Sequence, residues 1–276
     1  MKSLLKKLLQ SNAMLWRAAN RMLARHRARA AKRFLIAGNF FPDQLDAIVA
    51  DFEYSITDVG NRGVPQILNI EELVRHVAGE GVSGAFVECG TYKGGASAYA
   101  LLSLMRNERG KLARPYWGFD SFEGMPKPSK RDGSYAVRWM QSNDPDQVSN
   151  ADVSGDLVGS AVNRADYDSC LRYLRATGYP EDKINLVRGW FQETLPVNRT
   201  RIGPIAILRM DGDFHESTKV ILEMLYDSVT IGGAIIIDDY GAFEGCSAAV
   251  NEFLSGRSIR PYLHYVENGI RFFIKT

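Results

Sequence analysis

The chain has 276 residues, 45% of them hydrophobic, and a formal net charge of +2. This length allows one large domain with a well-filled core, or one domain with an appendage. The sequence argues against three classes of protein. A membrane-spanning protein is not indicated, because no apolar run approaches the roughly 18 residues of a spanning helix. A disulfide-framework protein and a zinc protein are not indicated either, because the three cysteines form no disulfide framework and the four histidines lack the spacing of a zinc site. The unpaired cysteines favour a cytoplasmic location.

Residues 1–36 are predicted to form a basic amphipathic helical arm. They hold ten of the 34 lysines and arginines, and the first acidic residue is Asp43. Apolar and small residues recur at steps of three and four, at Leu4, Leu8, Ser11, Leu15, Ala19 and Met22. Such a helix can pack on its own domain or in a homo-oligomer, or make peripheral contact with the inner membrane surface or an acidic partner. Nucleic acid is not expected as a partner, because aromatic residues are not interleaved with the cations.

Residues 37–80 are predicted to be a helical N-terminal extension of the core. Its clearest helix is "NIEELVRHVAGEG", which we expect to be capped near Asn69 and to end at Gly79 or Gly81.

Residues 81–276 alternate between predicted strands and helices. The predicted strands cover 84–90, 115–120, 184–189, 204–211 and 232–239, and the helices cover 94–106, 166–179, 216–229 and 244–256. Two alternating runs around Asn268-Gly269 predict a C-terminal hairpin. This order predicts an α/β fold with a doubly wound, mostly parallel sheet, helices on both faces and an antiparallel hairpin at one edge.

Residues 123–165 interrupt this alternation with many Pro, Gly, Ser and Asp residues. A long stretch with little regular structure is usually a functional lid or a disordered segment. The apolar and aromatic run "YAVRWM" within it favours a lid.

Acidic side chains follow most of the predicted strands, at Glu88, Asp120, Asp211 with Asp213, and Asp238 with Asp239. The carboxyl ends of parallel strands meet at one edge of a sheet, where ligands bind. Close carboxylates repel each other unless a cation or a proton lies among them, and a set of aspartates suits Mg²⁺. The alternative is structural: Asp213 would cap a helix starting near Glu216, and the 238–239 pair would begin a loop.

The first strand is followed by the glycine-rich turn "ECGTYKGG". With Glu88 it is similar to the motif that holds the amino-acid end of S-adenosylmethionine (SAM) in methyltransferases. Glycines for packing alone are the alternative. Asp120 ends the second strand, where an acid commonly accepts hydrogen bonds from ribose hydroxyls.

Five motifs occur together and in order: Ala85–Gly90 with Gly94-Gly95, "FDSFEGMP" (119–126), "VRGWFQETLP" (187–196), "LRMDGDFHEST" (208–218) and "GGAIIIDDYG" (232–241). Over residues 60–255 the chain resembles the macrocin O-methyltransferase (TylF-like) family. The resemblance implies the class I SAM methyltransferase fold. It also implies a SAM- and Mg²⁺-dependent O-methyltransferase that acts on sugar hydroxyls of glycosylated natural products or glycans.

The resemblance also implies roles for individual residues. Asp211, Asp238 and Asp239 would hold the metal. Asp213 would be the catalytic base, with His215 as a competing candidate. The cofactor would contact Glu88, Gly90, Thr91, Tyr92, Gly94, Asp120, Ser121 and Asp211. Phe214-His215 departs from the Leu-Tyr pair more usual in the family, which leaves the acceptor open.

Two other functions remain compatible with these residues. A metal-dependent glycosyltransferase also uses an Asp-x-Asp motif, and a membrane-associated, non-enzymatic adaptor could be built on the basic arm.

Overall fold

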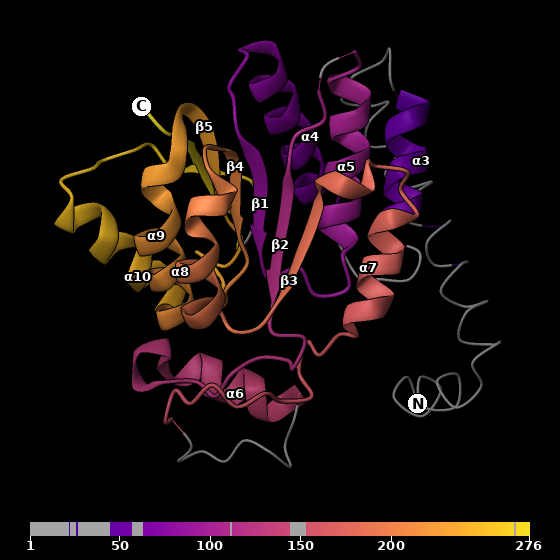
Figure 1. The fold of residues 1–276 in the computed structure, drawn as a ribbon. Coiled ribbons are helices and arrows are strands. Elements are labelled where there is room, and N and C mark those ends of the chain that lie inside the picture. Colours follow the sequence, from indigo (N-terminus) through magenta and orange to yellow (C-terminus); the bar gives the residue numbers. More distant parts are fainter. Residues whose placement is uncertain are drawn as a thin grey trace.

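The computed structural model describes residues 22, 26, 45–56, 63–110, 112–143, 153–267 and 269–276. Most of the predicted arm of residues 1–36 therefore lies outside the described residues. The described chain forms a seven-stranded sheet of order β3-β2-β1-β4-β5-β7-β6 (Figure 1). All neighbouring strands from β3 to β5 are parallel, whereas β7 is antiparallel to both β5 and β6. The predicted doubly wound sheet and its C-terminal hairpin are confirmed.

The strands are β1 (Ala85–Cys89), β2 (Tyr116–Asp120), β3 (Ile184–Arg188), β4 (Ile205–Met210), β5 (Val229–Ile237), β6 (His264–Tyr265) and β7 (Arg271–Ile274). The α-helices are α3 (Leu45–Ile56), α4 (Val64–Gly79), α5 (Gly95–Asn107), α6 (Gly133–Asn143), α7 (Tyr167–Arg175), α8 (Phe191–Ile202), α9 (His215–Leu225) and α10 (Glu244–Gly256). The described residues also form the 3-10 helices η1 (Lys130–Asp132), η2 (Glu181–Lys183) and η3 (Tyr226–Ser228).

The sheet separates two helical layers. Figure 1 shows α3, α4, α5 and α7 on one side and α8, α9 and α10 on the other. β1 and β4 are buried along their whole length, because helices cover both faces. Apolar side chains of the two faces form two separate core clusters. No helix among the described residues is long and apolar enough to cross a membrane.

Two helical expectations need correction. The helix α4 begins at Val64 after Gly63, with a proline in its first turn, so Asn69 lies buried inside the helix and does not cap it. Pro65 favours this earlier start because its fixed φ suits the first turn of a helix. The helix α8 was not predicted at all, because its sequence contains Pro196 and has little apolar periodicity.

The stretch 123–165 is more regular than expected. Its residues 130–143 form η1 and α6, and Ser129 and Asp132 make a capping box at the start of η1. Ala136 and Met140 are fully buried in the same core cluster as residues of α9 and α10. Figure 1 shows α6 across the end of the sheet, apart from both helical layers. Its apolar face gives this segment a packed position that its turn-rich composition did not indicate. Residues 144–152 lie outside the described part of the chain.

Candidate active site

The carboxyl ends of the parallel strands border a cavity of about 240 Å³. Its lining comes from the loops after β1, β2, β3 and β4 and from the segment 123–165. The lining residues are Gly90, Tyr92, Asp120, Ser121, Gly124, Met125, Pro126, Asn163, Trp190, Phe191, Asp211, Gly212, Asp213 and Ser217. Residues 124–126 and Asn163 belong to the predicted lid, so this segment contributes to the wall of the cavity that Asp120, Asp211 and Asp213 also line.

The turns after β1 and β2 together hold Asp120 in place. The backbone amides of Tyr92 and Phe122 each donate a hydrogen bond of 2.7 Å to a different oxygen of Asp120. Both donors have the positive φ angles that non-glycine residues rarely adopt, 53° and 57°. Gly90 lies against Asp211, since a Cβ atom at Gly90 would lie 2.0 Å from the carbonyl oxygen of Asp211. Burial raises the pKa of Asp120 more than these hydrogen bonds lower it.

Three aspartates beside the cavity form a compact oxygen cluster. Carboxylate oxygens of Asp211, Asp213 and Asp239 all lie within 4.8 Å of one another. The amide of Asp213 also donates to Oδ2 of Asp239 at 3.0 Å. Burial, and then the charges of Asp213, Asp211 and Asp238, raise the pKa of Asp239 well above its usual range. The cluster is therefore a site where a proton or a cation is strongly favoured.

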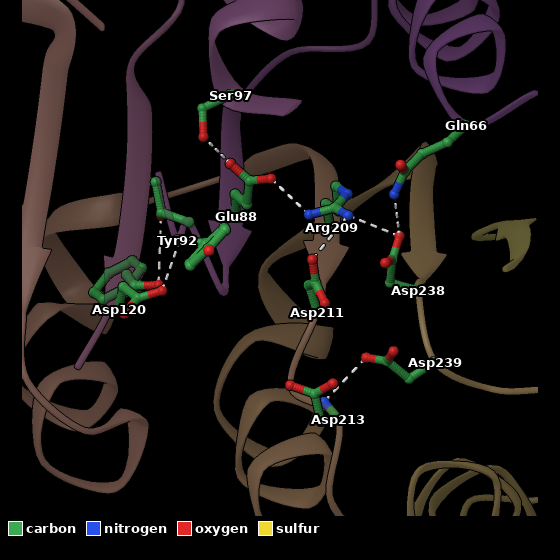
Figure 2. Close-up of polar contacts among 12 residues, drawn as sticks. Gln66, Glu88, Tyr92, Ser97, Asp120, Arg209, Asp211, Asp213, Asp238 and Asp239 are labelled. Atoms are coloured by element: carbon green, nitrogen blue, oxygen red, sulfur yellow. Dashed lines mark hydrogen bonds and ion pairs between the residues drawn. The ribbon is translucent and has the colours of Figure 1, made fainter. Parts of the chain in front are cut away.

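Asp238 faces a different set of groups. Its Oδ1 accepts hydrogen bonds of 2.7 Å from Nε2 of Gln66 and from Nη2 of Arg209 (Figure 2). The oxygen cluster and the predicted metal set thus differ at one position. Asp211 and Asp239 belong to both, whereas the cluster has Asp213 and the predicted set has Asp238. Arg209 nevertheless links the two groups, because the same Nη2 also donates to Oδ2 of Asp211 at 2.9 Å.

Arg209 is a fully buried cation that the sequence analysis missed. Its Nη1 donates to Oε1 of Glu88 at 2.6 Å, and its Nη2 contacts Asp211 and Asp238. Burial disfavours the charged guanidinium, but the three carboxylates outweigh burial and raise the pKa of Arg209 well above its usual range. The signal was present in the sequence: a charged residue inside the apolar run "PIAILRMD" requires buried partners.

The other residues predicted for the cofactor divide into two groups. Gly90, Tyr92, Asp120, Ser121 and Asp211 line the cavity, whereas Glu88, Thr91 and Gly94 are not among its lining residues. Glu88 is buried and also accepts hydrogen bonds from the hydroxyls of Ser97 and Tyr116. The cavity also contains Trp190, Phe191 and Ser217, which belong to the quoted family motifs but were assigned no role, and Asn163, which lies in the segment 123–165 without a recognisable ligand pattern.

His215 is placed away from the cavity. Its ring nitrogens lie 3.1 Å from carboxylate oxygens of Glu216 and Glu252, and the side chain has 0% exposure. It is the first residue of α9, and its amide donates to Oδ1 of Asp132 at 2.6 Å. Asp213 therefore does not cap this helix: Phe214 is the N-cap residue, and Asp132 from η1 satisfies the first amide.

Comparison with known proteins identifies this arrangement. The profile of the macrocin-O-methyltransferase (TylF) family matches residues 51–275. The chain is 35% identical over 192 residues to an 8-demethyl-8-(2,3-dimethoxy-alpha-L-rhamnosyl)-tetracenomycin-C 4'-O-methyltransferase of Streptomyces olivaceus. It is 33% identical over 191 residues to a demethyldecarbamoylnovobiocin O-methyltransferase of Streptomyces niveus. Each match covers 69% of this chain and 66% of the relative.

A solved structure of the O-methyltransferase NovP is also similar, with a TM-score of 0.62 and 29% identity over 78% of this chain and 81% of that one. The class I SAM methyltransferase fold is thereby confirmed, and the match argues against the glycosyltransferase and adaptor interpretations. The chain belongs to the macrocin-O-methyltransferase (TylF) family, a family of O-methyltransferases.

Proposed function

We propose that this O-methyltransferase transfers the methyl group of SAM to a sugar hydroxyl of a glycosylated natural product, with Mg²⁺ held by Asp211, Asp238 and Asp239. The observation that carries the proposal is the cluster of carboxylates, Asp211 and Asp239 among them, at the edge of a cavity lined by the loops after the strands and by residues of the segment 123–165. The name of the relative from S. olivaceus includes a rhamnosyl group, which supports a sugar as the acceptor.

The chemistry of the donor set fits a divalent cation. Carboxylate oxygens are the ligands that Mg²⁺ prefers. Two of the three proposed ligands, Asp211 and Asp239, have carboxylate oxygens within 4.8 Å of each other and of Asp213. The third, Asp238, lies outside that cluster and is linked to Asp211 through Nη2 of Arg209. Arg209 balances only part of the negative charge of its three carboxylate partners. A bound Mg²⁺ would supply the remaining positive charge and would stabilise the alkoxide that develops on the acceptor.

The cavity fits the nucleoside part of SAM. Each oxygen of Asp120 accepts one backbone amide, and a carboxylate oxygen can accept a second hydrogen bond. Asp120 is therefore suited to bind the ribose hydroxyls. Trp190 and Phe191 give the same cavity an aromatic wall that suits adenine.

Asp213 is the proposed base. Its carboxylate lines the cavity and lies in the oxygen cluster, so it can reach a hydroxyl held beside Asp211 and Asp239. In the reaction the acceptor oxygen forms a bond to the methyl carbon as the carbon–sulfur bond breaks. The hydroxyl proton passes to the carboxylate of Asp213, and the products are the methyl ether and S-adenosylhomocysteine. Alignment of the acceptor with the methyl group and proton removal by Asp213 both lower the barrier.

A screen with isotopically labelled SAM against glycosylated acceptors tests this proposal. We expect label in the sugar of at least one acceptor, loss of transfer in EDTA and its recovery when Mg²⁺ is restored. Full turnover in EDTA would reject the metal role. Label found only on hydroxyls of aglycones would reject the sugar acceptor.

A further inference from the structure

Asp238 receives two buried hydrogen bonds on one oxygen atom from distant parts of the chain. Nε2 of Gln66 and Nη2 of Arg209 both donate to its Oδ1 at 2.7 Å. Gln66 is 6% exposed and Arg209 is 0% exposed. Gln66 lies in the first turn of α4, before the first strand of the sheet, so the carboxylate is held by an element outside the loops that line the cavity (Figure 2).

The guanidinium of Arg209 fixes three carboxylates relative to one another. Its Nη2 carries two hydrogens and donates to both Asp211, at the end of β4, and Asp238, at the end of β5. Its Nη1 donates to Glu88 on β1. Because the guanidinium is a planar and rigid fork, the directions of these hydrogen bonds set the orientations of all three carboxylates. A lysine ammonium has one nitrogen and cannot reproduce this spacing.

We propose that Arg209 and Gln66 are positioning residues that orient Asp211 and Asp238 toward the bound Mg²⁺. This inference rests on the proposed function, because it takes Asp211 and Asp238 as ligands of the metal. Neither Arg209 nor Gln66 lines the cavity, so both act through the aspartates and not on SAM or the acceptor.

The physical effect expected is a loss of preorganisation. Carboxylates on adjacent strands repel each other, and without fixed donors they rotate apart. Partners that orient metal ligands typically contribute about 10–100-fold to metal affinity. Loss of Gln66 removes one hydrogen bond from Asp238 and leaves the ion pairs of Arg209 in place. It is therefore the milder of the two perturbations.

The experiment compares Gln66→Ala and Arg209→Lys with two matched controls. Asn198 in α8 is also a buried helical amide, and its Nδ2 donates to the carbonyl of Thr194 away from the cavity, so Asn198→Ala matches Gln66→Ala. Arg114 is paired with Glu108 and donates to the carbonyl of Gly84 near the opposite edge of the sheet, so Arg114→Lys matches Arg209→Lys. For each full-length variant, Mg²⁺ binding is measured by calorimetry with S-adenosylhomocysteine present, together with kcat, the half-saturating Mg²⁺ concentration and the melting temperature.

We expect Gln66→Ala and Arg209→Lys to weaken Mg²⁺ binding by about 10–100-fold, whereas the controls keep the wild-type value. Excess Mg²⁺ should restore kcat in Gln66→Ala. A variant that lost activity only because it is less stable would not recover in this way. If Arg209→Lys does not fold, Gln66→Ala decides the question. If the wild type requires Mg²⁺ but Gln66→Ala binds it as tightly, the positioning inference is overturned and the proposed function stands. If the wild type neither binds nor requires Mg²⁺, the metal part of the proposed function fails, and this inference fails with it.

Discussion

The backbone amide of Asp213 donates a 3.0 Å hydrogen bond to the carboxylate of Asp239, which joins the loop after β4 to the loop after β5. Asp213 has a φ angle of 55°, a conformation that costs energy for most residues with a side chain. Its surroundings hold this conformation, and the carboxylate of Asp213 consequently lies beside those of Asp211 and Asp239 at the edge of the cavity. The position is suited to a base that removes a proton from a nearby hydroxyl.

Replacement of Asp213 by asparagine separates proton removal from binding. Asparagine tolerates the same left-handed conformation, so the loop should keep its shape. We expect kcat to fall by about 10²–10⁴-fold, the usual contribution of a positioned base, while SAM and Mg²⁺ still bind. Single-turnover transfer from labelled SAM measures the chemical step, and calorimetry measures the two binding constants.

The other candidate base supplies the control. The ring of His215 lies between Glu216 and Glu252 and does not line the cavity. His215→Gln should therefore lower the melting temperature and leave the chemical step nearly unchanged. An active Asp213→Asn variant with an inactive His215→Gln variant would transfer the role of base to His215.

Asp120 is expected to determine the affinity for SAM. In Asp120→Ala the hydrogen bonds to the ribose hydroxyls are lost, at a cost on the order of 1.5–3 kcal/mol for each bond to a charged group. The backbone amides of Tyr92 and Phe122 also lose their acceptor, which loosens the turn. Calorimetric titration with SAM measures the effect. Asp227→Ala is the control, because Asp227 pairs with Arg257 just before β5, at the opposite edge of the sheet. Equal SAM affinity in the two variants would remove Asp120 from the binding site.

The five parallel strands could be predicted from the sequence because each one is an apolar run that ends at an acidic or glycine residue. The same rule placed Asp120, Asp211 and Asp239 at one edge of the sheet, and the cavity borders that edge. The helix α8 escaped prediction because Pro196 and weak apolar periodicity hide it. The periodicity of apolar residues indicates which side of a helix or strand is buried. It therefore predicts where the helices and strands are, but not which residues their polar side chains contact.

The partners of the site residues could not be predicted, because they are far apart in the chain. Gln66 and Asp238 are separated by 172 positions, and Asp132 and the amide of His215 by 83. A single sequence carries no signal for such pairs. Arg209 is the exception, since a buried arginine in a strand must have acceptors even when their identity is unknown.

The docking of α6 on the core can be tested through Gly245. A Cβ atom at Gly245 would lie 2.3 Å from Oδ1 of Asp132 and 3.0 Å from the amide nitrogen of His215. The added methyl group must therefore displace Asp132 from the start of α9. We expect Gly245→Ala to lower stability by about 1–3 kcal/mol, as overpacking does, and to make residues 123–143 more sensitive to protease. Chemical denaturation and limited proteolysis with mass spectrometry measure the two effects.

Gly256 provides a matched control in the same helix. No atom lies within 4 Å of a Cβ placed at Gly256. Gly256→Ala should therefore leave protease sensitivity unchanged and raise stability slightly, by about 0.5–1 kcal/mol, through lower chain entropy in the unfolded state. Equal protease sensitivity of the two variants would show that the contact of Asp132 with α9 does not hold the lid segment in place.

The pH dependence of stability tests the electrostatics of the aspartate cluster. Burial and the neighbouring charges of Asp213, Asp211 and Asp238 raise the pKa of Asp239 well above its usual range. Between the unfolded pKa, about 3.9, and the higher folded pKa, the folded state binds more protons than the unfolded state. Stability from this group is thus fully present below the unfolded pKa and is lost as pH rises through the folded pKa.

Asp239→Asn removes this titration and keeps an acceptor for the amide of Asp213. In EDTA the variant should melt at a higher temperature than the wild type at pH 8, and the difference should shrink toward pH 4. A cation competes with the proton for the same carboxylates, so Mg²⁺ should raise the melting temperature of the wild type at pH 8 more than at pH 5, and should have little effect on the variant. Differential scanning calorimetry across this pH range measures both effects. Parallel pH profiles for the two proteins in EDTA would show that Asp239 is ionised in the folded state without a cation, and the charge argument for the metal site would then fail.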